Sequence, residues 1–203
     1  MSAYPVMVEG AAISALVVGG GRVGARRALG LADAGARVRV VAPALSAALR
    51  AAAQRSASLT LAARPYVAGD IGDATVIVAA TSSREVNARV AADARALGRL
   101  VNVADAPEDG NFVAAATHRA GDLVVAVSAG GVPGAAVRVR DCVAQRFDGR
   151  YADAVAELAA LRRRTLGERG AAAWREAADA LTGPDFCAAV ESGEFRERLA
   201  VWR

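Results

Sequence analysis

Apolar and polar residues alternate along the first half of the chain in runs that predict strands and helices in turn. The predicted strands are 13–18, 37–41, 59–62, 75–80 and 100–103, and the predicted helices are 22–34, 44–55 and 84–97. The run 75–80 reads Thr-Val-Ile-Val-Ala-Ala, which is typical of a strand buried on both faces. This alternation predicts an α/β fold, a Rossmann-like parallel sheet with right-handed crossovers.

The pattern changes after about residue 112. Residues 123–128 predict one more strand, which a glycine loop connects to a helix opening near Pro133. From residue 150 onward only helical patterns remain, over 151–164, 168–181 and 184–202. We therefore expect three parts: a Rossmann-like domain over 1–112, a middle segment over 113–149, and a small helical domain over 150–203.

The composition removes several classes of chemistry. The formal charge of +4 comes from 25 basic residues, all of them arginine. Without lysine, the chain has no Walker P-loop, no Tyr-x-x-x-Lys dehydrogenase motif and no Schiff-base chemistry. Its one histidine, His118, excludes a multi-histidine metal cage, and we predict no fixed metal site.

Partners and compartment follow from the same counts. Only 4% of the residues are aromatic and the arginines are dispersed, so we expect no nucleic-acid partner. The longest uncharged stretch, 123–137, is short and interrupted by glycine and proline, so we expect no membrane segment. Two cysteines 45 residues apart, Cys142 and Cys187, do not form a disulfide scaffold. A cytoplasmic, reducing location is the expectation.

A glycine motif lies between the first predicted strand and the first predicted helix. Gly19, Gly21 and Gly24 form G-x-G-x-x-G, the pattern that binds a dinucleotide. Gly19 makes the tight turn, Gly21 admits a pyrophosphate to the backbone, and Gly24 lets the helix pack closely. The amides of Arg22 and Val23 open the helix and face the phosphate charge. The alternative is a glycine-rich turn without a ligand.

The carboxylate that normally binds the adenosine ribose is missing at the end of the second strand. Pro43 and Ala44 stand there instead, so ribose contacts would come from backbone groups. Arg37 and Arg39 could indicate a 2′-phosphate, but their alternation with valine equally fits a solvent-facing edge. We predict NAD as the cofactor rather than NADP.

Further segments carry a family resemblance over residues 3–140. They are Tyr4-Pro5-Val6, Leu16 to Val23, Ala34 to Val38, Val40 to Pro43, Ile77 to Thr81, Glu85-Val86-Asn87, Val101 to Asp105, Asn111-Phe112 and Val125 to Gly131. In this order the segments resemble the precorrin-2 dehydrogenase (sirohydrochlorin synthase) family, which corresponds to the N-terminal part of siroheme synthase.

The resemblance implies an oxidoreductase that converts precorrin-2 to sirohydrochlorin with NAD+, in tetrapyrrole synthesis toward siroheme or cobalamin. It also implies a homodimer in which 1–112 binds NAD, 113–149 is the dimerisation segment and 150–203 is helical. Some members insert Fe2+ into the product, so Fe2+ is expected here only as a possible substrate.

Asp105 matches the family's catalytic aspartate after the fifth strand. A carboxylate at the carboxyl end of a parallel strand is placed to act as a general base. The alternative role is a turn cap before Pro107. Thr81 is the candidate cofactor contact after the fourth strand, and a helix N-cap is its alternative.

The candidate substrate-binding residues follow residue 115. They are Ser128, Gly130, Gly131, Arg119 and Arg138, with Arg140 as a further candidate. Arginine forks suit the carboxylates of a tetrapyrrole. Ser82 and Ser83 stand where the family has acids, Ala129 replaces a second serine and His118 replaces an acid. These departures argue against iron insertion more than against oxidation. The competing hypotheses are an NAD-sensing module without catalysis and a chelatase alone.

Overall fold

The computed structural model describes residues 3–202 and consists of two compact units, which meet in sequence between Ala114 and Ala115. The first unit holds the predicted α/β pattern, and the second holds the rest of the chain. The finer three-part division at residues 112 and 149 stays a prediction.

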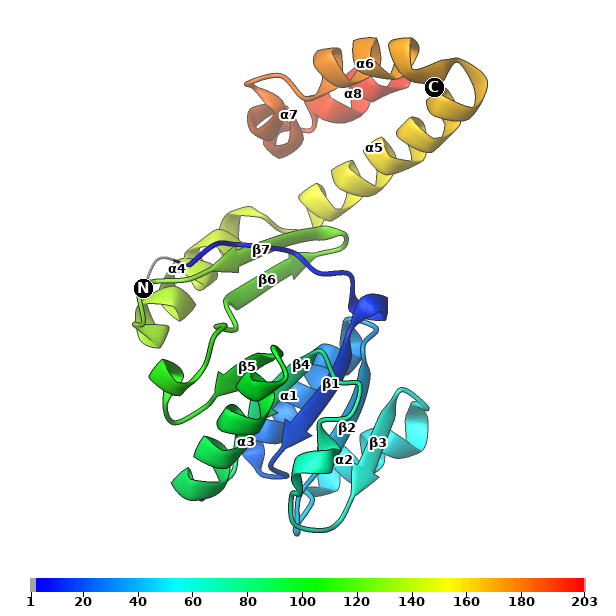
Figure 1. The fold of residues 1–203 in the computed structure, drawn as a ribbon. Helices are drawn as coiled ribbons and strands as arrows, with labels where there is room; N and C mark the ends of the chain where they lie inside the picture. The colour runs from blue at the N-terminus through cyan, green and yellow to red at the C-terminus, as the bar shows by residue number, and fades with distance from the viewer. Residues whose placement is uncertain (1–2, 203) are drawn as a thin grey trace. The chain divides into compact units, whose positions relative to one another are not determined.

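The first unit is a five-stranded parallel sheet with helices on both faces (Figure 1). Its strands are β1 (Ser14–Val18), β2 (Arg37–Val41), β3 (Leu59–Ala62), β4 (Val76–Ala79) and β5 (Leu100–Val103), and its helices are α1 (Arg22–Asp33), α2 (Ala47–Arg55) and α3 (Arg84–Ala96). Short 3-10 turns lie at Gly10–Ala12, Ala68–Asp70 and Pro107–Asp109. The strand order β3-β2-β1-β4-β5, with every pair parallel, confirms the Rossmann-like prediction.

Two apolar layers bury the sheet from both sides. Along β1, Ala15 and Val17 face the layer formed with α1 and α2, while Leu16 and Val18 face the layer formed with α3. Because both faces are covered, the strands read as continuous apolar runs. The strand order reverses at β1, with β2 and β3 on one side of it and β4 and β5 on the other, which places a topological switch point at the carboxyl ends of β1 and β4.

The connection between β3 and β4 contains no α-helix. Hydrogen bonds to the buried carboxylate of Asp70 stabilise it. Asp70 is 2% exposed and accepts two hydrogen bonds from Arg64, at 2.8 and 2.5 Å. It also accepts the Val67 amide at 2.9 Å, and Arg39 donates to its backbone carbonyl. The Arg64 guanidinium holds the pKa of the Asp70 carboxyl below its ordinary value of 3.8.

Replacing Arg64 with Ala is expected to lower the free energy of unfolding at neutral pH, because the buried Asp70 carboxylate loses its charged partner. Since the folded pKa of Asp70 is lowered, this stabilisation is complete above the unfolded pKa and is lost as the pH falls through the folded one. Urea titrations of wild type and variant should therefore differ at pH 7 and converge in acid.

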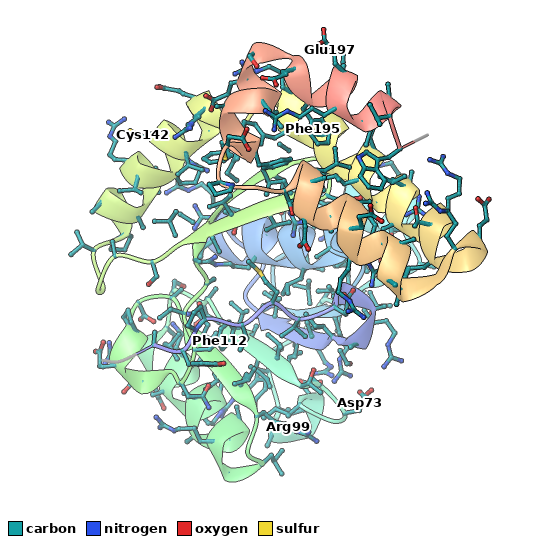
Figure 2. All side chains as sticks on the ribbon, turned by 90° about the horizontal axis from the view of Figure 1, so that it is seen from above. Asp73, Arg99, Phe112, Cys142, Phe195 and Glu197 are labelled. Carbon is teal, nitrogen blue, oxygen red and sulfur yellow. The ribbon has the colours of Figure 1, made fainter. Side chains whose placement is uncertain are left out.

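The matched control for Arg64 is Arg37→Ala. Arg37 pairs with Asp73 at 3.6 Å, and both side chains are largely exposed (Figure 2 labels Asp73). An exposed pair of this kind contributes at most about 1 kcal/mol. Equal losses in the two variants would contradict the role given to Asp70.

The second unit begins with a hairpin and continues as helices. Its elements are β6 (Ala116–Ala120), β7 (Leu123–Val127), α4 (Pro133–Arg146), α5 (Gly149–Glu168), α6 (Gly170–Leu181), α7 (Phe186–Ser192) and α8 (Glu194–Ala200). β6 and β7 pair antiparallel in a sheet of their own, joined by a turn in which Gly121 has a φ of 57°. The expected strand at 123–128 is therefore present, whereas its partner β6 was not predicted.

The helical part differs from the prediction in its breaks. The single helix expected over 184–202 is split into α7 and α8 at Gly193, whose φ of 90° ends a helix. In its core, Phe195, which Figure 2 labels, packs edge-on against Phe186 with ring centroids 5.5 Å apart. Among residues 3–202, no helix is both long and apolar enough to cross a membrane.

Candidate functional site

The glycine motif forms a tight connection between β1 and α1, and two of its glycines are required by contacts. Gly19 has a φ of 127°, and a Cβ there would lie 2.3 Å from the Ala80 carbonyl oxygen. A Cβ on Gly24 would lie 2.0 Å from the Gly19 carbonyl oxygen. The loop is thus pressed against β4 on one side and against the first turn of α1 on the other, as the motif predicts.

Gly20 is a third required glycine that the motif did not single out. A Cβ on Gly20 would lie 2.1 Å from the Ala44 carbonyl oxygen, and the Gly20 carbonyl accepts the Ser46 amide at 3.1 Å. The Pro43–Ala44 loop therefore packs directly on the glycine loop. The only sequence signal for this contact is the unbroken run of three glycines.

Gly21 differs from its neighbours because its surroundings are open. It is exposed, and a Cβ there would meet no atom within 4 Å. The amides of Arg22, Val23 and Gly24 follow at the start of α1, where no acceptor lies within the helix. Within residues 3–202 no side chain caps this helix start and no backbone carbonyl accepts these three amides. The arrangement fits a diphosphate, which needs both the space and the donors.

At the carboxyl end of β2, a ligand would meet backbone groups and no charged side chain. Pro43 and Ala44 are exposed there. Arg37 begins the strand and pairs with Asp73, and Arg39 is bound to the Asp70 carbonyl, so neither arginine stands at the carboxyl end of β2. β2 lies between β1 and β3, so the solvent-facing edge considered for it is wrong. Without a cation at this end of the strand, nothing there favours a 2′-phosphate.

Thr81 and Asp105, predicted separately, are joined by one buried side chain. Asn87 in the first turn of α3 is fully buried and donates its Nδ2 to Asp105 Oδ1 at 2.8 Å. The same amide accepts from the Thr81 amide at 3.0 Å and from Thr81 Oγ1 at 2.8 Å. The helix N-cap is Ser83, which accepts the Val86 amide, so the N-cap role considered for Thr81 is wrong.

Asp105 itself is exposed at the carboxyl end of β5. Its other oxygen, Oδ2, has no hydrogen-bond or ion-pair partner in the described part of the chain. The loop that carries Asp105 is bound to β5 at its later end. The Asn111 side chain accepts a hydrogen bond from the Val101 amide at 2.7 Å, and the Asn102 side chain donates one to the Phe112 carbonyl at 3.1 Å. Asp105 is thus a carboxylate with one bound oxygen and one free oxygen on a fixed loop.

The predicted substrate residues lie in the second unit. Ser128, Gly130 and Gly131 form an exposed loop before α4, in which the two glycines have φ of 56° and 86°. This backbone leads into a helix start that no side chain caps. Because α4 begins with Pro133, which has no N–H, and the Val132 amide donates to the Ala129 carbonyl at 2.9 Å, this helix start offers fewer free amides than the start of α1.

The two predicted arginines of this unit do not converge. His118 bonds the Phe147 carbonyl at the end of α4, so its side chain faces that helix. Arg119 follows it in β6 and points to the opposite face of the hairpin. Arg138 is exposed on α4, and within residues 3–202 neither arginine has an ion-pair partner, whereas Arg140 pairs with Asp141 at 2.7 Å.

The described residues do not form a cluster of metal ligands. In the part of the chain that the structure describes, no three His, Cys, Asp or Glu residues cluster as a metal site. His118 is hydrogen-bonded to backbone, and both cysteines are free.

The fold and the glycine loop define a dinucleotide-binding α/β protein. Residues 6–116 match the NAD(P)-binding family, and the chain belongs to it. This confirms the predicted nicotinamide cofactor, and the uncharged end of β2 favours NAD.

Two curated relatives match the same part of the chain. The siroheme synthase of Ectopseudomonas mendocina is 41% identical over 116 residues, 57% of this chain and 24% of that protein. The siroheme synthase of Pseudomonas putida is 46% identical over 116 residues, again 57% of this chain and 25% of that protein. The chain thus matches about a quarter of the length of these relatives.

A solved structure matches the whole chain. The structure titled "SirC, precorrin-2 dehydrogenase" has a TM-score of 0.78 and 26% sequence identity, and the match covers 98% of this chain and 100% of that one. The match includes the helical region, for which the sequence resemblance gave only size and placement. The resemblance to the precorrin-2 dehydrogenase family is therefore confirmed.

Proposed function

We propose that this chain oxidises precorrin-2 to sirohydrochlorin with NAD+ as the hydride acceptor. The observation that carries the proposal is the placement of Asp105. A carboxylate with a free oxygen stands at the carboxyl end of β5, on the sheet edge that also holds the glycine loop and Thr81. The full-length match to a precorrin-2 dehydrogenase supports the choice of substrate.

Different residues of the chain bind the cofactor and accept the proton. The amides of Arg22, Val23 and Gly24 bind the diphosphate, and the open space at Gly21 admits it. The backbone of Pro43 and Ala44 would contact the ribose, and Thr81 would contact the cofactor beyond it. The cofactor, when bound, supplies the hydride acceptor. Asp105 accepts the proton that the substrate loses along with its hydride, which balances the two-electron oxidation.

Substrate binding falls to the second unit in this proposal. The carboxylates of precorrin-2 are recognised by Arg119 and Arg138, which have no other ion-pair partner within the described residues, and by the backbone of Ser128, Gly130 and Gly131. The two arginines point to different faces of their unit, so they would contact different carboxylates, or carboxylates bound to different subunits.

The experiment is to incubate the purified protein with precorrin-2 and NAD+ under anaerobic conditions and to follow NADH and sirohydrochlorin together. We expect one NADH for each sirohydrochlorin formed. Absence of any NAD-dependent spectral change would contradict the proposal. Adding Fe2+ to the product then tests whether the ion is a further substrate.

A homodimer in the cytoplasm is also proposed. α4 runs for 14 residues, yet only Ala136 in it is buried, and Val132, Val137 and Val139 are exposed on or beside it. One side of α4 packs on β6 and β7, and the exposed valines indicate a further surface that another chain covers. A second copy is the expected occupant, as the family resemblance implies.

Replacing Val139 with Asp is therefore expected to shift the protein from dimer to monomer, because the substitution would bury a charge without a partner. Sedimentation velocity of the variant measures this directly. The control is Val201→Asp, which adds the same charge at an exposed valine outside α4. A monomeric wild type, or dimers in both variants, would contradict the assignment of this surface.

A further inference from the structure

We propose that Asn87 is the positioning residue for Asp105: its buried amide fixes the direction in which the carboxylate presents its free oxygen. This inference rests on the proposed function, because only there is Asp105 the proton acceptor.

The orientation of the Asn87 amide is determined by its backbone partners. Oδ1 lies 3.0 Å from the Thr81 nitrogen, and Nδ2 lies 3.2 Å from the Thr81 carbonyl oxygen. A backbone N–H only donates and a carbonyl only accepts, so turning the amide over would lose both bonds. The remaining hydrogen of Nδ2 is therefore fixed on Asp105 Oδ1, 2.8 Å away.

This single bond is what restrains the Asp105 side chain. The residue is exposed, and no other hydrogen bond or ion pair to its carboxylate exists in the described part of the chain. With Oδ1 bound, Oδ2 is left in one position for the substrate proton. Such placement matters because a displacement of about 1 Å at a reacting group can lower the rate about 100-fold.

The bond is not needed to hold the loop. Asn111 and Asn102 tie the loop to β5, and Arg84 pairs with Asp109 at 3.2 Å. The start of α3 is capped by Ser83. The contact with Asp105 is therefore surplus to the fold, which points to a role in directing the carboxylate.

The test is the isosteric variant Asn87→Asp. It keeps an oxygen facing the Thr81 amide and hydroxyl but places a second carboxylate against Asp105. We expect kcat to fall at least about 30-fold, with KM for NAD+ changed less than about threefold. The rising limb of the pH–rate profile should move to higher pH, because a neighbouring like charge disfavours the ionised form. In an Asp105→Asn background, the same change should lower the residual rate less than about twofold.

Two further variants separate positioning from folding. Asn111→Ala loosens the same loop without touching Asp105, so it should lower the melting temperature and leave the pH–rate profile in place. Asp105→Glu is at an exposed position and folds even if the Asn87 variant does not. It should lose at least about 30-fold in kcat, since the longer side chain carries the carboxylate away from its fixed place.

The outcomes are distinguishable. A wild type that makes no NADH from precorrin-2 overturns the proposed function and this inference with it. An active wild type overturns the inference alone if Asn87→Asp keeps its kcat and pH profile, or if Asp105→Glu turns over at the wild-type rate. An equal loss from Asn87→Asp with and without Asp105 also overturns it, because that loss would be structural.

Discussion

Replacing Asp105 with Asn is expected to lower kcat for precorrin-2 oxidation by about 100- to 1,000-fold, because a positioned general base typically contributes a factor of this size. The substitution keeps the shape of the side chain and an oxygen that can accept from Asn87 Nδ2. It removes the negative charge and, with it, the capacity to take a proton. The Kd for NAD+ should stay within about twofold of wild type, since Asp105 lies on the loop after β5 and the glycine loop follows β1.

Glu108→Gln is the matched control for Asp105. Glu108 lies on the same loop, is exposed, and within residues 3–202 pairs only with Arg84, at 3.5 Å, so its loss should leave kcat unchanged. Stopped-flow measurement of NADH formation compares the three proteins. If Asp105→Asn keeps full turnover, catalysis does not pass through this carboxylate. If the wild type binds NAD+ without any turnover, the NAD-sensing alternative is favoured.

Replacing Gly21 with Ala is expected to raise the Kd for NAD+ at least about 30-fold, or about 2 kcal/mol, without lowering the melting temperature. Gly21 has φ of −78° and ψ of −171°, which alanine adopts freely, and its Cβ would meet no protein atom within 4 Å. The methyl group would occupy only the space assigned to the diphosphate. Isothermal titration with NAD+ and thermal denaturation measure the two quantities separately.

Gly24→Ala is the contrasting variant. Its Cβ would lie 2.0 Å from the Gly19 carbonyl oxygen, so α1 must shift and the protein should lose about 1–3 kcal/mol of stability. Gly21 thus leaves space for the ligand, whereas Gly19, Gly20 and Gly24 leave space for neighbouring backbone atoms. An unchanged Kd in Gly21→Ala would contradict the placement of the diphosphate in this loop.

The fold of the first unit was predictable because its local signals agree with its tertiary structure. Fully buried strands such as β4 read as apolar runs, and glycines mark the ends of strands and helices. β6 was not predicted because its sequence, Ala-Thr-His-Arg-Ala, has three consecutive polar residues, and its one β-branched residue, Thr117, is exposed. Its strand conformation comes from pairing with β7, which the local pattern does not contain.

The site was predictable where a residue's role is local and unpredictable where it depends on packing. Gly19, Gly21 and Gly24 have roles that follow from their position between a strand and a helix. Gly20 is required by a carbonyl from the end of β2, and Asn87 joins two loops that are 24 residues apart at Thr81 and Asp105. Contacts of this kind appear only when the strand order is known.

The same limit applies to the substrate residues. Arg119 and Arg138 were grouped because they flank one loop in sequence. The side-chain alternation of β6, fixed by the bond between His118 and Phe147, sends Arg119 to the face away from α4. Sequence proximity therefore did not predict that the two arginines would point in different directions.

The most direct measurement is a crystal structure of the protein with NAD+ bound. We expect the diphosphate on the amides of Arg22, Val23 and Gly24, beside Gly21. We expect the nicotinamide ring on the side of Thr81, with Asp105 Oδ2 facing the substrate space next to it. NAD+ bound elsewhere, or a nicotinamide ring directed toward β3 and away from Asp105, would contradict it.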